Sequence, residues 1–339
     1  MILKVNTSSK TYPIVLERGL LEHVKDFFHF DDSKVFIITD DGVPSIYLET
    51  LKNQIPHAFS LVLKQGEHAK SFDNYVLINQ ELTKYNFSRK DILIALGGGV
   101  VGDLTGFVAS TYKRGIRFVN IPTTTLSQID SSVGGKTAIN FNNVKNIIGS
   151  FYQPDIVLID FNSLKTLPKR HLYNGLVEAL KMGLILSKEL YEIFKKDDYL
   201  DYLEEIITSS IKLKIDIVEK DEKENNLRQI LNFGHTLAHG FESLFSLEKV
   251  LHGEAVANGM LYMIEDETIK EEVKSIIGKM GIEIIKDFCA QEMMKYISND
   301  KKADAQGVNL VLVKEVGQAN IVKMSLDQVK KRIVGEENE

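Results

Sequence analysis

The sequence predicts an α/β N-terminal domain with a parallel sheet, followed by a mainly α-helical C-terminal domain. The first observation is the length of 339 residues, which exceeds one ordinary core and favours two domains. The second is that short apolar, β-branched runs alternate with helical patterns up to about residue 160, as in parallel α/β sheets. The third is that helical patterns dominate beyond that point. We therefore expect domains at residues 1–160 and 161–339.

The strands of the first domain are marked by apolar runs that end at turn residues. The expected strands are 35–39, 57–63, 91–96, 117–122 and 155–160. A helix is expected over 71–85, after the second of these strands, because apolar residues recur there at helical spacing and Ser71 is a suitable N-cap.

The second domain is predicted from helical spacing that continues from Leu167 to about Ser298. Two short strand-like runs, 308–314 and 318–323, then flank Glu315-Val316-Gly317, which predicts a β-hairpin. A final helix is expected over 325–334.

Composition excludes several classes of protein. The 41 basic and 47 acidic residues give a net charge of −6, which does not suit binding of nucleic acid through bulk charge. No apolar run approaches the roughly 20 residues of a membrane helix, and MILKVNTSSK lacks the apolar core of a signal peptide. The single cysteine, Cys289, allows no internal disulfide. We expect a cytoplasmic protein without a membrane or nucleic-acid partner.

A glycine loop, GGGVVGD at 97–103, follows one of the predicted strands and precedes a helical pattern. Glycines let backbone N–H groups approach a phosphate, and the positive end of a helix dipole favours it. The acidic residue that a Rossmann fingerprint has about 20 positions later is absent, since VNIPTTT occupies that region. The loop therefore predicts a nucleotide-pyrophosphate site that is not a classical Rossmann site.

The segment SSVGGKTAIN at 131–140 resembles the end of a phosphate-binding P-loop. A P-loop needs a glycine five residues before its Gly-Lys, where this chain has Asp130, so a kinase or ATPase is excluded. Lys136 and the nearby Lys145 are either two solvated lysines or parts of an anion pocket, and the scarcity of other charges between 117 and 154 favours the pocket.

Four polar residues are predicted to form a row on one helix in RQILNFGHTLAHGF, 228–241. Arg228, Asn232, His235 and His239 follow spacings of four, three and four, which place them on one helical face. Buried polar groups without partners cost about 1–3 kcal/mol each, so we expect the row to line a polar cleft.

The histidines of this row predict a metal site. A catalytic zinc site typically has three protein ligands, and histidine is the commonest of them. Spacing alone favours His235 and His239 as the metal pair, with His252 supporting them from outside. Glu178 could supply a carboxylate ligand from GLVEALKMG, or could only pair with Lys181 three residues later.

Together these segments resemble the 3-dehydroquinate synthase family of the sugar-phosphate cyclase group. The resemblance runs from about Asp91 to Lys302. It is carried by GGGVVGDLTGF, YKRGIRF, IPTTTLSQIDSSVGGKTAIN, KNIIGSFYQP, LKTLP, GLVEALKMG, DEKENNLR, LNFGHTLAHGFE, LHGEAVANGM and NDKK.

The resemblance implies an NAD-binding N-terminal domain and a C-terminal domain that holds Zn²⁺ or Co²⁺. The metal ligands it implies are Glu178, His235 and His252, with His239 facing substrate instead. The implied cofactor residues are Asp40, Glu67, Lys70, Gly98, Gly99, Val100, Asp103, Thr123, Thr124, Lys136, Lys145, Leu164 and Thr166. The implied substrate and catalytic residues are Asp130, Lys136, Asn146, Lys181, Lys214, Glu224, Arg228, Asn232 and His239, together with Arg114 from a neighbouring subunit and Lys302, preferred over Lys301.

The implied reaction converts 3-deoxy-D-arabino-heptulosonate 7-phosphate, an acidic sugar phosphate, into 3-dehydroquinate and phosphate. The role of Arg114 implies a homodimer. Three alternatives remain at this stage: another sugar-phosphate cyclase, a metal- and NAD-dependent polyol dehydrogenase, and a non-catalytic nucleotide-binding protein. A dehydrogenase has no need of the cations Lys136, Lys145, Arg228 and Arg114, which favours a cyclase.

Overall fold

The computed structural model describes residues 1–30, 33–142, 144–245, 249–299 and 307–334. The chain forms two compact units. Unit 1 comprises Met1–Leu172 and Lys214–Lys223, and unit 2 comprises Tyr173–Leu213 and Glu224–Glu339. None of the described helices combines the length and the apolar character needed to cross a bilayer.

A seven-stranded sheet forms the centre of unit 1, in the order β1-β2-β9-β6-β5-β3-β4. The β1–β2 pair is antiparallel and every other pair is parallel, which confirms the predicted sheet. The strands are β1 (Ile2–Asn6), β2 (Thr11–Glu17), β3 (Val35–Asp40), β4 (Phe59–Leu63), β5 (Ile92–Gly97), β6 (Arg117–Pro122) and β9 (Ile156–Asp160). All five predicted strands are present, whereas β1 and β2 had no prediction.

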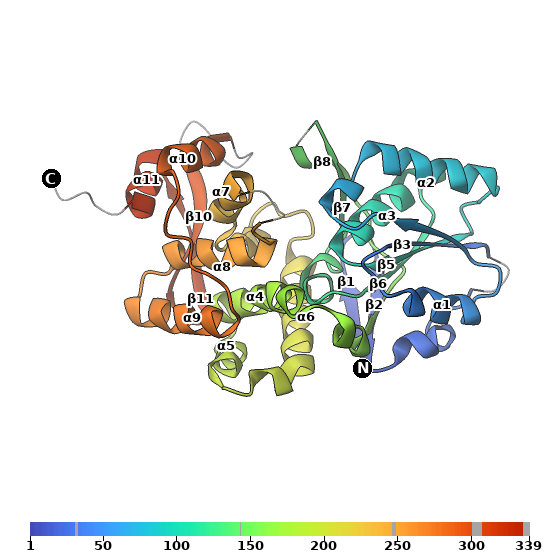
Figure 1. The fold of residues 1–339 in the computed structure, drawn as a ribbon, viewed down its shortest axis with the longest axis horizontal. Helices are drawn as coiled ribbons and strands as arrows, with labels where there is room; N and C mark the ends of the chain where they lie inside the picture. The colour runs from blue at the N-terminus through green and yellow to red at the C-terminus, as the bar shows by residue number, and fades with distance from the viewer. Residues whose placement is uncertain (31–32, 143, 246–248, 300–306, 335–339) are drawn as a thin grey trace. The chain divides into compact units, whose positions relative to one another are not determined.

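Helices cover both faces of this sheet (Figure 1). α2 (Phe72–Lys84) and α3 (Gly99–Thr111) contribute to the core on one face, and α1 (Ser45–Gln54) contributes to the core on the other. Alternate residues of one strand serve the two cores: Phe36 packs in the first and Ile37 in the second. As predicted, Ser71 caps α2, since its side chain accepts a hydrogen bond from the Asn74 N–H at 3.2 Å.

A separate antiparallel hairpin, β7 (Lys136–Phe141) and β8 (Val144–Phe151), also belongs to unit 1. It packs on the α3 side, where Ile139 is part of the core. Short 3-10 and π turns complete the unit: η1 (Leu20–Glu22), η2 (Val24–Asp26), η3 (Glu67–Ala69), η4 (Tyr112–Arg114), η5 (Ser127–Ser131) and η6 (Phe161–Thr166).

Unit 2 is mainly helical, as predicted, and includes an antiparallel hairpin of β10 (Val308–Glu315) and β11 (Gln318–Met324). The predicted hairpin and the predicted last helix are both present. The remaining elements of the C-terminal half are α4 (Lys169–Leu186), α5 (Lys188–Lys195), η7 (Tyr199–Tyr202), α6 (Leu203–Lys220), η8 (Leu227–Asn232), α7 (His235–Phe245), α8 (His252–Met263), α9 (Glu267–Lys279), α10 (Ala290–Asn299) and α11 (Leu326–Val334). Helices α4 and α6 start in one unit and end in the other.

Candidate active site

The carboxyl ends of β3, β5 and β6 bring several predicted cofactor residues to one edge of the unit 1 sheet. These strands are parallel neighbours, so the residues that follow them meet at the same edge. Asp40 ends β3, Gly98 and Gly99 follow β5, and Thr123 and Thr124 follow β6. The helices α1 and α3 leave this edge toward opposite faces of the sheet, which is the usual setting of a nucleotide site in an open α/β sheet.

The glycine loop forms the strand–turn–helix geometry that a phosphate site requires. Gly98 is the N-cap of α3, and no side chain caps it among the described residues. Gly99 and Val100 are the first residues of this 13-residue helix. The positive end of the helix dipole therefore points out of the carboxyl edge of the sheet.

A buried lysine connects three other predicted residues of unit 1. Lys70 Nζ lies 2.6 Å from Asp103 Oδ2 and 3.9 Å from Glu67 Oε1, and it donates to the Asn146 side chain. Burial alone would lower the pKa of Lys70, but Asp103 and Glu67 outweigh it and raise the pKa. At the neighbouring strand end, burial raises the pKa of Asp40.

Asp130 and Lys214 also come together in unit 1. Asp130 lies on η5, and its carboxylate accepts a hydrogen bond from Lys214 Nζ at 2.7 Å. By contrast, Lys136 and Lys145 lie at opposite ends of the β7–β8 hairpin, because Lys136 pairs with Phe151 and Lys145 is near the turn. The joint anion pocket predicted from their short sequence separation is therefore wrong.

Four further predicted residues occupy separate places. Arg114 ends η4 and is exposed. Leu164 and Thr166 lie on η6 after β9, and Thr166 Oγ1 lies 2.8 Å from Tyr47 Oη. Lys302, like Lys301, lies outside the described residues.

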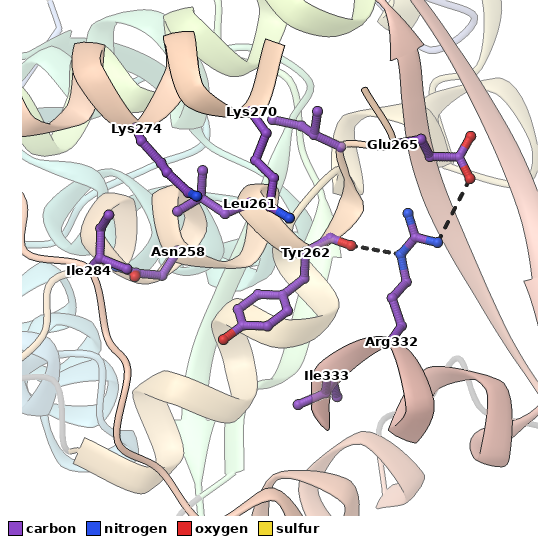
Figure 2. A pocket seen from close by; sticks show the side chains of 10 residues that line it. Asn258, Leu261, Tyr262, Glu265, Lys270, Lys274, Ile284, Arg332 and Ile333 are labelled. Carbon is purple, nitrogen blue, oxygen red and sulfur yellow. Dashed lines mark hydrogen bonds and ion pairs between the residues drawn. The ribbon is translucent and has the colours of Figure 1, made fainter. Parts of the chain in front are cut away.

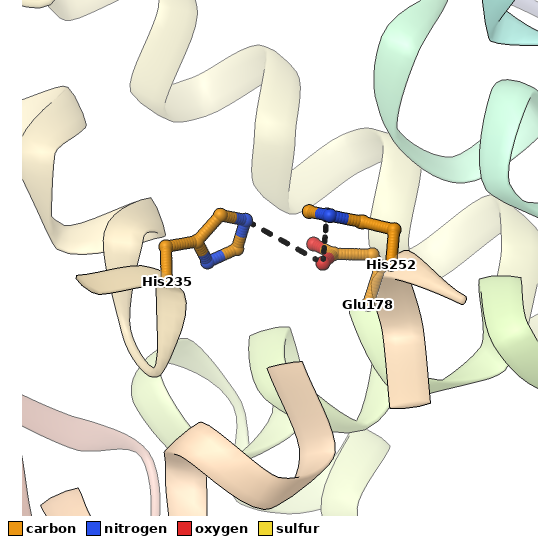
Figure 3. A group of neighbouring side chains, drawn as sticks. All are labelled: Glu178, His235 and His252. Carbon is orange, nitrogen blue, oxygen red and sulfur yellow. Dashed lines mark ion pairs between the residues drawn. The ribbon is translucent and has the colours of Figure 1, made fainter. Parts of the chain in front are cut away.

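Three predicted ligands converge in unit 2. Glu178 comes from α4, His235 begins α7 and His252 begins α8. One ligand atom from each lies within 4.8 Å of the others, and among the described residues no other group of three or more potential ligands meets this criterion. Both Nε2 atoms approach Glu178 Oε1, at 3.7 Å from His235 and 3.5 Å from His252, and Figure 3 shows the two rings directed at the carboxylate.

The other nitrogen of each imidazole has a hydrogen-bond partner that leaves Nε2 available. His235 Nδ1 lies 3.1 Å from the Phe233 carbonyl oxygen, and His252 Nδ1 lies 2.8 Å from Glu242 Oε1. Metal-binding histidines usually donate their second N–H in this way. Glu242 was missed as a separate site residue from the sequence, although it stands seven positions after His235 and so shares its helical face.

Charges around Glu178 keep it ionised in a fully buried position. Burial would raise its pKa, but Lys181, whose Nζ lies 2.5 Å from Oε2, and the two histidines hold the pKa well below its usual range. Neither carboxylate oxygen has a partner of acceptable hydrogen-bond geometry among the described residues. Burial and the nearby Lys181 charge hold the pKa of His235 well below its usual range, which keeps that ring neutral.

The polar row of 228–241 is not one continuous helix, which corrects the prediction. Arg228 and Asn232 lie on η8, and His235 and His239 lie on α7. Gly234 separates the two elements with a φ of +78°, a left-handed conformation that favours glycine. A side chain there would also meet the Val256 carbonyl oxygen at 2.9 Å.

The remaining polar residues surround the ligand cluster without joining it. His239 lies one turn after His235, with their ring centroids 6.0 Å apart, and is not a member of the three-residue group. Lys181 Nζ donates to the Leu231 carbonyl oxygen at 2.7 Å. Asn232 Nδ2 donates to Glu224 Oε1 at 2.7 Å, and Arg228 is buried.

A cavity of roughly 540 Å³ in unit 2 contains none of the predicted site residues. Its walls come from α8, α9, α11 and the segments next to them (Figure 2). The basic side chains that line it have acidic partners: Lys270 pairs with Glu267, Lys274 with Glu271, and Arg332 with Glu265. Each basic side chain that the described residues contribute to the cavity therefore has an acidic partner.

Family models match the chain in two adjoining segments. Residues 60–174 match the model described as 3-dehydroquinate synthase N-terminal, and residues 175–303 match 3-dehydroquinate synthase C-terminal. The chain is 40% identical over 335 residues to 3-dehydroquinate synthase from Dictyoglomus thermophilum, covering 95% of this chain and 94% of that protein. It is also 40% identical to the Streptococcus mutans protein of the same name over 350 residues, covering 97% and 99%.

Solved structures with the same fold include two synthases that bind NAD+ and a metal ion. A 2-deoxy-scyllo-inosose synthase complexed with carbaglucose-6-phosphate, NAD+ and Co2+ matches with a TM-score of 0.87 and 22% identity, covering 98% of this chain and 99% of that one. A 2-epi-5-epi-valiolone synthase from Streptomyces hygroscopicus with NAD+ and Zn2+ bound matches with a TM-score of 0.85 and 24% identity, covering 97% of each chain. A probable glycerol dehydrogenase from Sinorhizobium meliloti matches with a TM-score of 0.69 and 15% identity, covering 95% of each.

Proposed function

The chain belongs to the 3-dehydroquinate synthase family, and from this premise we propose that it converts 3-deoxy-D-arabino-heptulosonate 7-phosphate into 3-dehydroquinate and phosphate. The observation that carries the proposal is the convergence of Glu178, His235 and His252 in a chain that aligns with its relatives over nearly its whole length. The reaction removes phosphate from the substrate and closes a carbocycle without net oxidation.

We propose that Glu178, His235 and His252 hold a divalent cation, Zn²⁺ or Co²⁺. The donor set fits, because one carboxylate and two imidazole nitrogens are typical zinc ligands that leave a fourth position open. No described residue makes a hydrogen bond of acceptable geometry to the oxygens of the buried carboxylate, and a cation would satisfy them. Cyclases of the same fold bind Co²⁺ or Zn²⁺.

We propose that NAD⁺ binds at the carboxyl edge of the unit 1 sheet. The N-terminus of α3 suits its pyrophosphate, and Lys70, which pairs with Asp103 and Glu67, lies in the same unit. The residues assigned to the cofactor are Asp40, Glu67, Lys70, Gly98, Gly99, Val100, Asp103, Thr123, Thr124, Lys136, Lys145, Leu164 and Thr166. The last two follow β9, the strand next to β6 in the sheet.

The remaining residues are assigned to the substrate and its proton transfers. An acidic sugar phosphate carries a carboxylate and a phosphate, and Arg and Lys side chains fix both anions and orient the carbon chain between them. We assign the following residues to substrate binding or proton transfer: Asp130, Lys136, Asn146, Lys181, Lys214, Glu224, Arg228, Asn232, His239 and Lys302. Arg114 would be supplied by the partner in a homodimer.

The chemistry divides between bound groups and the protein. NAD⁺ would supply a reversible hydride transfer, and the divalent cation would lower the pKa of a substrate hydroxyl. The protein contributes fixed geometry and proton carriers. His239 and Glu224 are the proposed proton carriers, and the hydrogen bond from Asn232 holds the Glu224 carboxylate in place. Lys181 fixes the position of Glu178 through their ion pair.

Phosphate release tests the proposal. Purified protein with NAD⁺ and Zn²⁺ should release phosphate from 3-deoxy-D-arabino-heptulosonate 7-phosphate with no accumulation of NADH, and a chelator should stop the release. NADH that accumulates with a polyol would instead support a dehydrogenase. Phosphate release only from a sugar phosphate that lacks the carboxylate would identify another cyclase.

We also propose a cytoplasmic homodimer. The single Cys289 is exposed and free, which suits a reducing compartment. The exposed position of Arg114 at the end of η4 is compatible with a role in a partner's site. Sedimentation of the purified protein tests the dimer, and Arg114→Ala should reduce turnover without changing the metal content.

A further inference from the structure

Glu242 lies beside the three-residue cluster without belonging to it. Its Oε1 lies 2.8 Å from His252 Nδ1, and its side chain is only 7% exposed. Carboxylates are rarely this buried unless they are paired or hydrogen-bonded. One partner of Glu242 is therefore a proposed metal ligand, and the contact uses Nδ1, whereas Nε2 is the nitrogen near Glu178.

The chemistry of imidazole gives this contact a consequence for the opposite nitrogen. A neutral imidazole has one N–H and one lone pair, on different nitrogens. An ionised carboxylate only accepts hydrogen bonds, so Glu242 favours the tautomer with its proton on Nδ1. In the neutral ring that binds a metal, the lone pair then lies on Nε2, the atom 3.5 Å from Glu178 Oε1. The backbone carbonyl of Phe233 has the same effect on His235.

The backbone of His252 is fixed by a different residue. Asn174 stands one turn before Glu178 on α4, and its Oδ1 accepts a hydrogen bond from the Gly253 N–H at 2.5 Å. The first turn of α8 is therefore tied to the helix that carries the carboxylate ligand. This backbone hydrogen bond still allows the His252 ring to rotate, and the contact with Glu242 restricts that rotation.

We infer that Glu242 is a positioning residue that holds His252 in the tautomer and orientation needed to bind a divalent cation together with Glu178 and His235. This inference rests on the proposed metal site. It also gives α7 two tasks, because the helix supplies one ligand, His235, and through Glu242 orients a second ligand that belongs to α8.

Metal affinity of stripped protein tests the inference without reference to turnover. Zn²⁺ is titrated in competition with a chromogenic chelator for the wild type, Glu242→Ala and Glu242→Gln. We expect Glu242→Ala to bind about 10- to 100-fold more weakly, as is typical for loss of such a partner. The Gln variant should lose less affinity, because its amide oxygen can still accept the hydrogen bond although the charge is gone.

Glu272→Gln is the matched control. Glu272 is a carboxylate of the same unit that accepts a hydrogen bond from Tyr191 Oη at 2.9 Å, but it is not part of the metal cluster. It should bind Zn²⁺ as tightly as the wild type. ¹⁵N NMR of labelled histidine supplies a second readout: zinc-bound wild type should show His252 protonated on Nδ1, and Glu242→Ala should show a mixture of states.

The possible outcomes distinguish the positioning role of Glu242 from the metal site itself. If the wild type binds Zn²⁺ and both Glu242 variants match it, the positioning role is wrong and the metal site stands. A variant that loses thermal stability but keeps its zinc affinity would assign Glu242 a purely structural role, which also overturns the inference. If the wild type itself fails to bind Zn²⁺, both the metal site and the inference fall.

Discussion

The side chain of Glu178 is fully buried, so its charge must be balanced by its immediate neighbours. Lys181 supplies one positive charge on the same helix, and a divalent cation held with His235 and His252 would supply more. The geometry therefore separates the three proposed ligands from His239 by position. His252 approaches the carboxylate, whereas His239 stays one turn away from His235 and outside the cluster.

Alanine variants of His252 and His239 should differ in metal content. His252→Ala removes a donor from the cluster, so the dialysed protein should contain little or no zinc by elemental analysis. His239→Ala should keep its zinc and lose turnover by roughly 100-fold or more, because it removes a proton carrier. If His239→Ala lost the metal while His252→Ala kept it, the proposed ligand set would be wrong.

Lys181→Met should destabilise the metal-free protein. Removing one partner of a buried ion pair leaves a buried charge uncompensated, and such changes cost about 3–5 kcal/mol. Urea unfolding of stripped protein measures the loss. The double variant Glu178→Gln with Lys181→Met is the control, because it removes both charges and should recover part of the stability. Equal stability of the single and double variants would show that the pair makes no such contribution.

The elements that a local pattern defines were predicted from the sequence. The strand β6 has the predicted bounds, and the Ser71 cap of α2 is present, because apolar runs and capping residues act locally. The break at Gly234 could not be predicted by counting residues on a helix. The residues that exclude a side chain at Gly234 belong to α8, and α8 begins 18 residues later in the chain.

The same limit applies to the candidate site. The resemblance assigned Glu178, His235 and His252, whereas spacing alone favoured the pair His235 and His239. Ligand atoms from α4, α7 and α8 converge through packing, and no periodicity in one segment encodes that convergence. The prediction that Lys136 and Lys145 share one anion pocket was wrong for the opposite reason, since the hairpin separates two residues that are near in sequence.

Gly259→Ala tests how closely α7 and α8 must approach. A Cβ at Gly259 would lie 2.1 Å from the Gly234 carbonyl oxygen, so the backbone would have to shift. We expect a loss of about 1–3 kcal/mol or more in unfolding free energy and weaker zinc binding, because the two helices carry His235 and His252. Gly278→Ala in α9 is the matched control. Its Cβ would meet no atom within 4 Å, so helix propensity should make it neutral or up to about 1 kcal/mol stabilising.

At the scale of the whole molecule, unit 1 is discontinuous in sequence. Its second segment, Lys214–Lys223, comes after Tyr173–Leu213, which belongs to unit 2. The helical pattern of α6 continues through Leu213 and Lys214 without a break, so no local signal marks the return. Glu222 helps to hold the segment Lys214–Lys223 in unit 1. Its carboxylate accepts hydrogen bonds from the hydroxyls of Ser8 and Ser9 and from Gln153 Nε2.

Glu222 should make stability depend on acidic pH. Burial would raise its pKa, but the bonds from Ser8, Ser9 and Gln153 outweigh burial and lower the pKa to about 2 from 4.5. Because the folded pKa is depressed, the contribution is complete above about pH 4.5 and is lost as the pH falls toward 2. It amounts to at most about 3 kcal/mol at neutral pH, because each pKa unit is worth about 1.4 kcal/mol. The melting temperatures of wild type and Glu222→Gln should therefore differ at pH 7 and converge in acid.

Glu219→Gln is the control, because it changes an exposed carboxylate that contacts Asn6. Its melting temperature should differ little from that of the wild type at either pH. A constant gap between wild type and Glu222→Gln across this range would show that the Glu222 charge does not secure the returning segment.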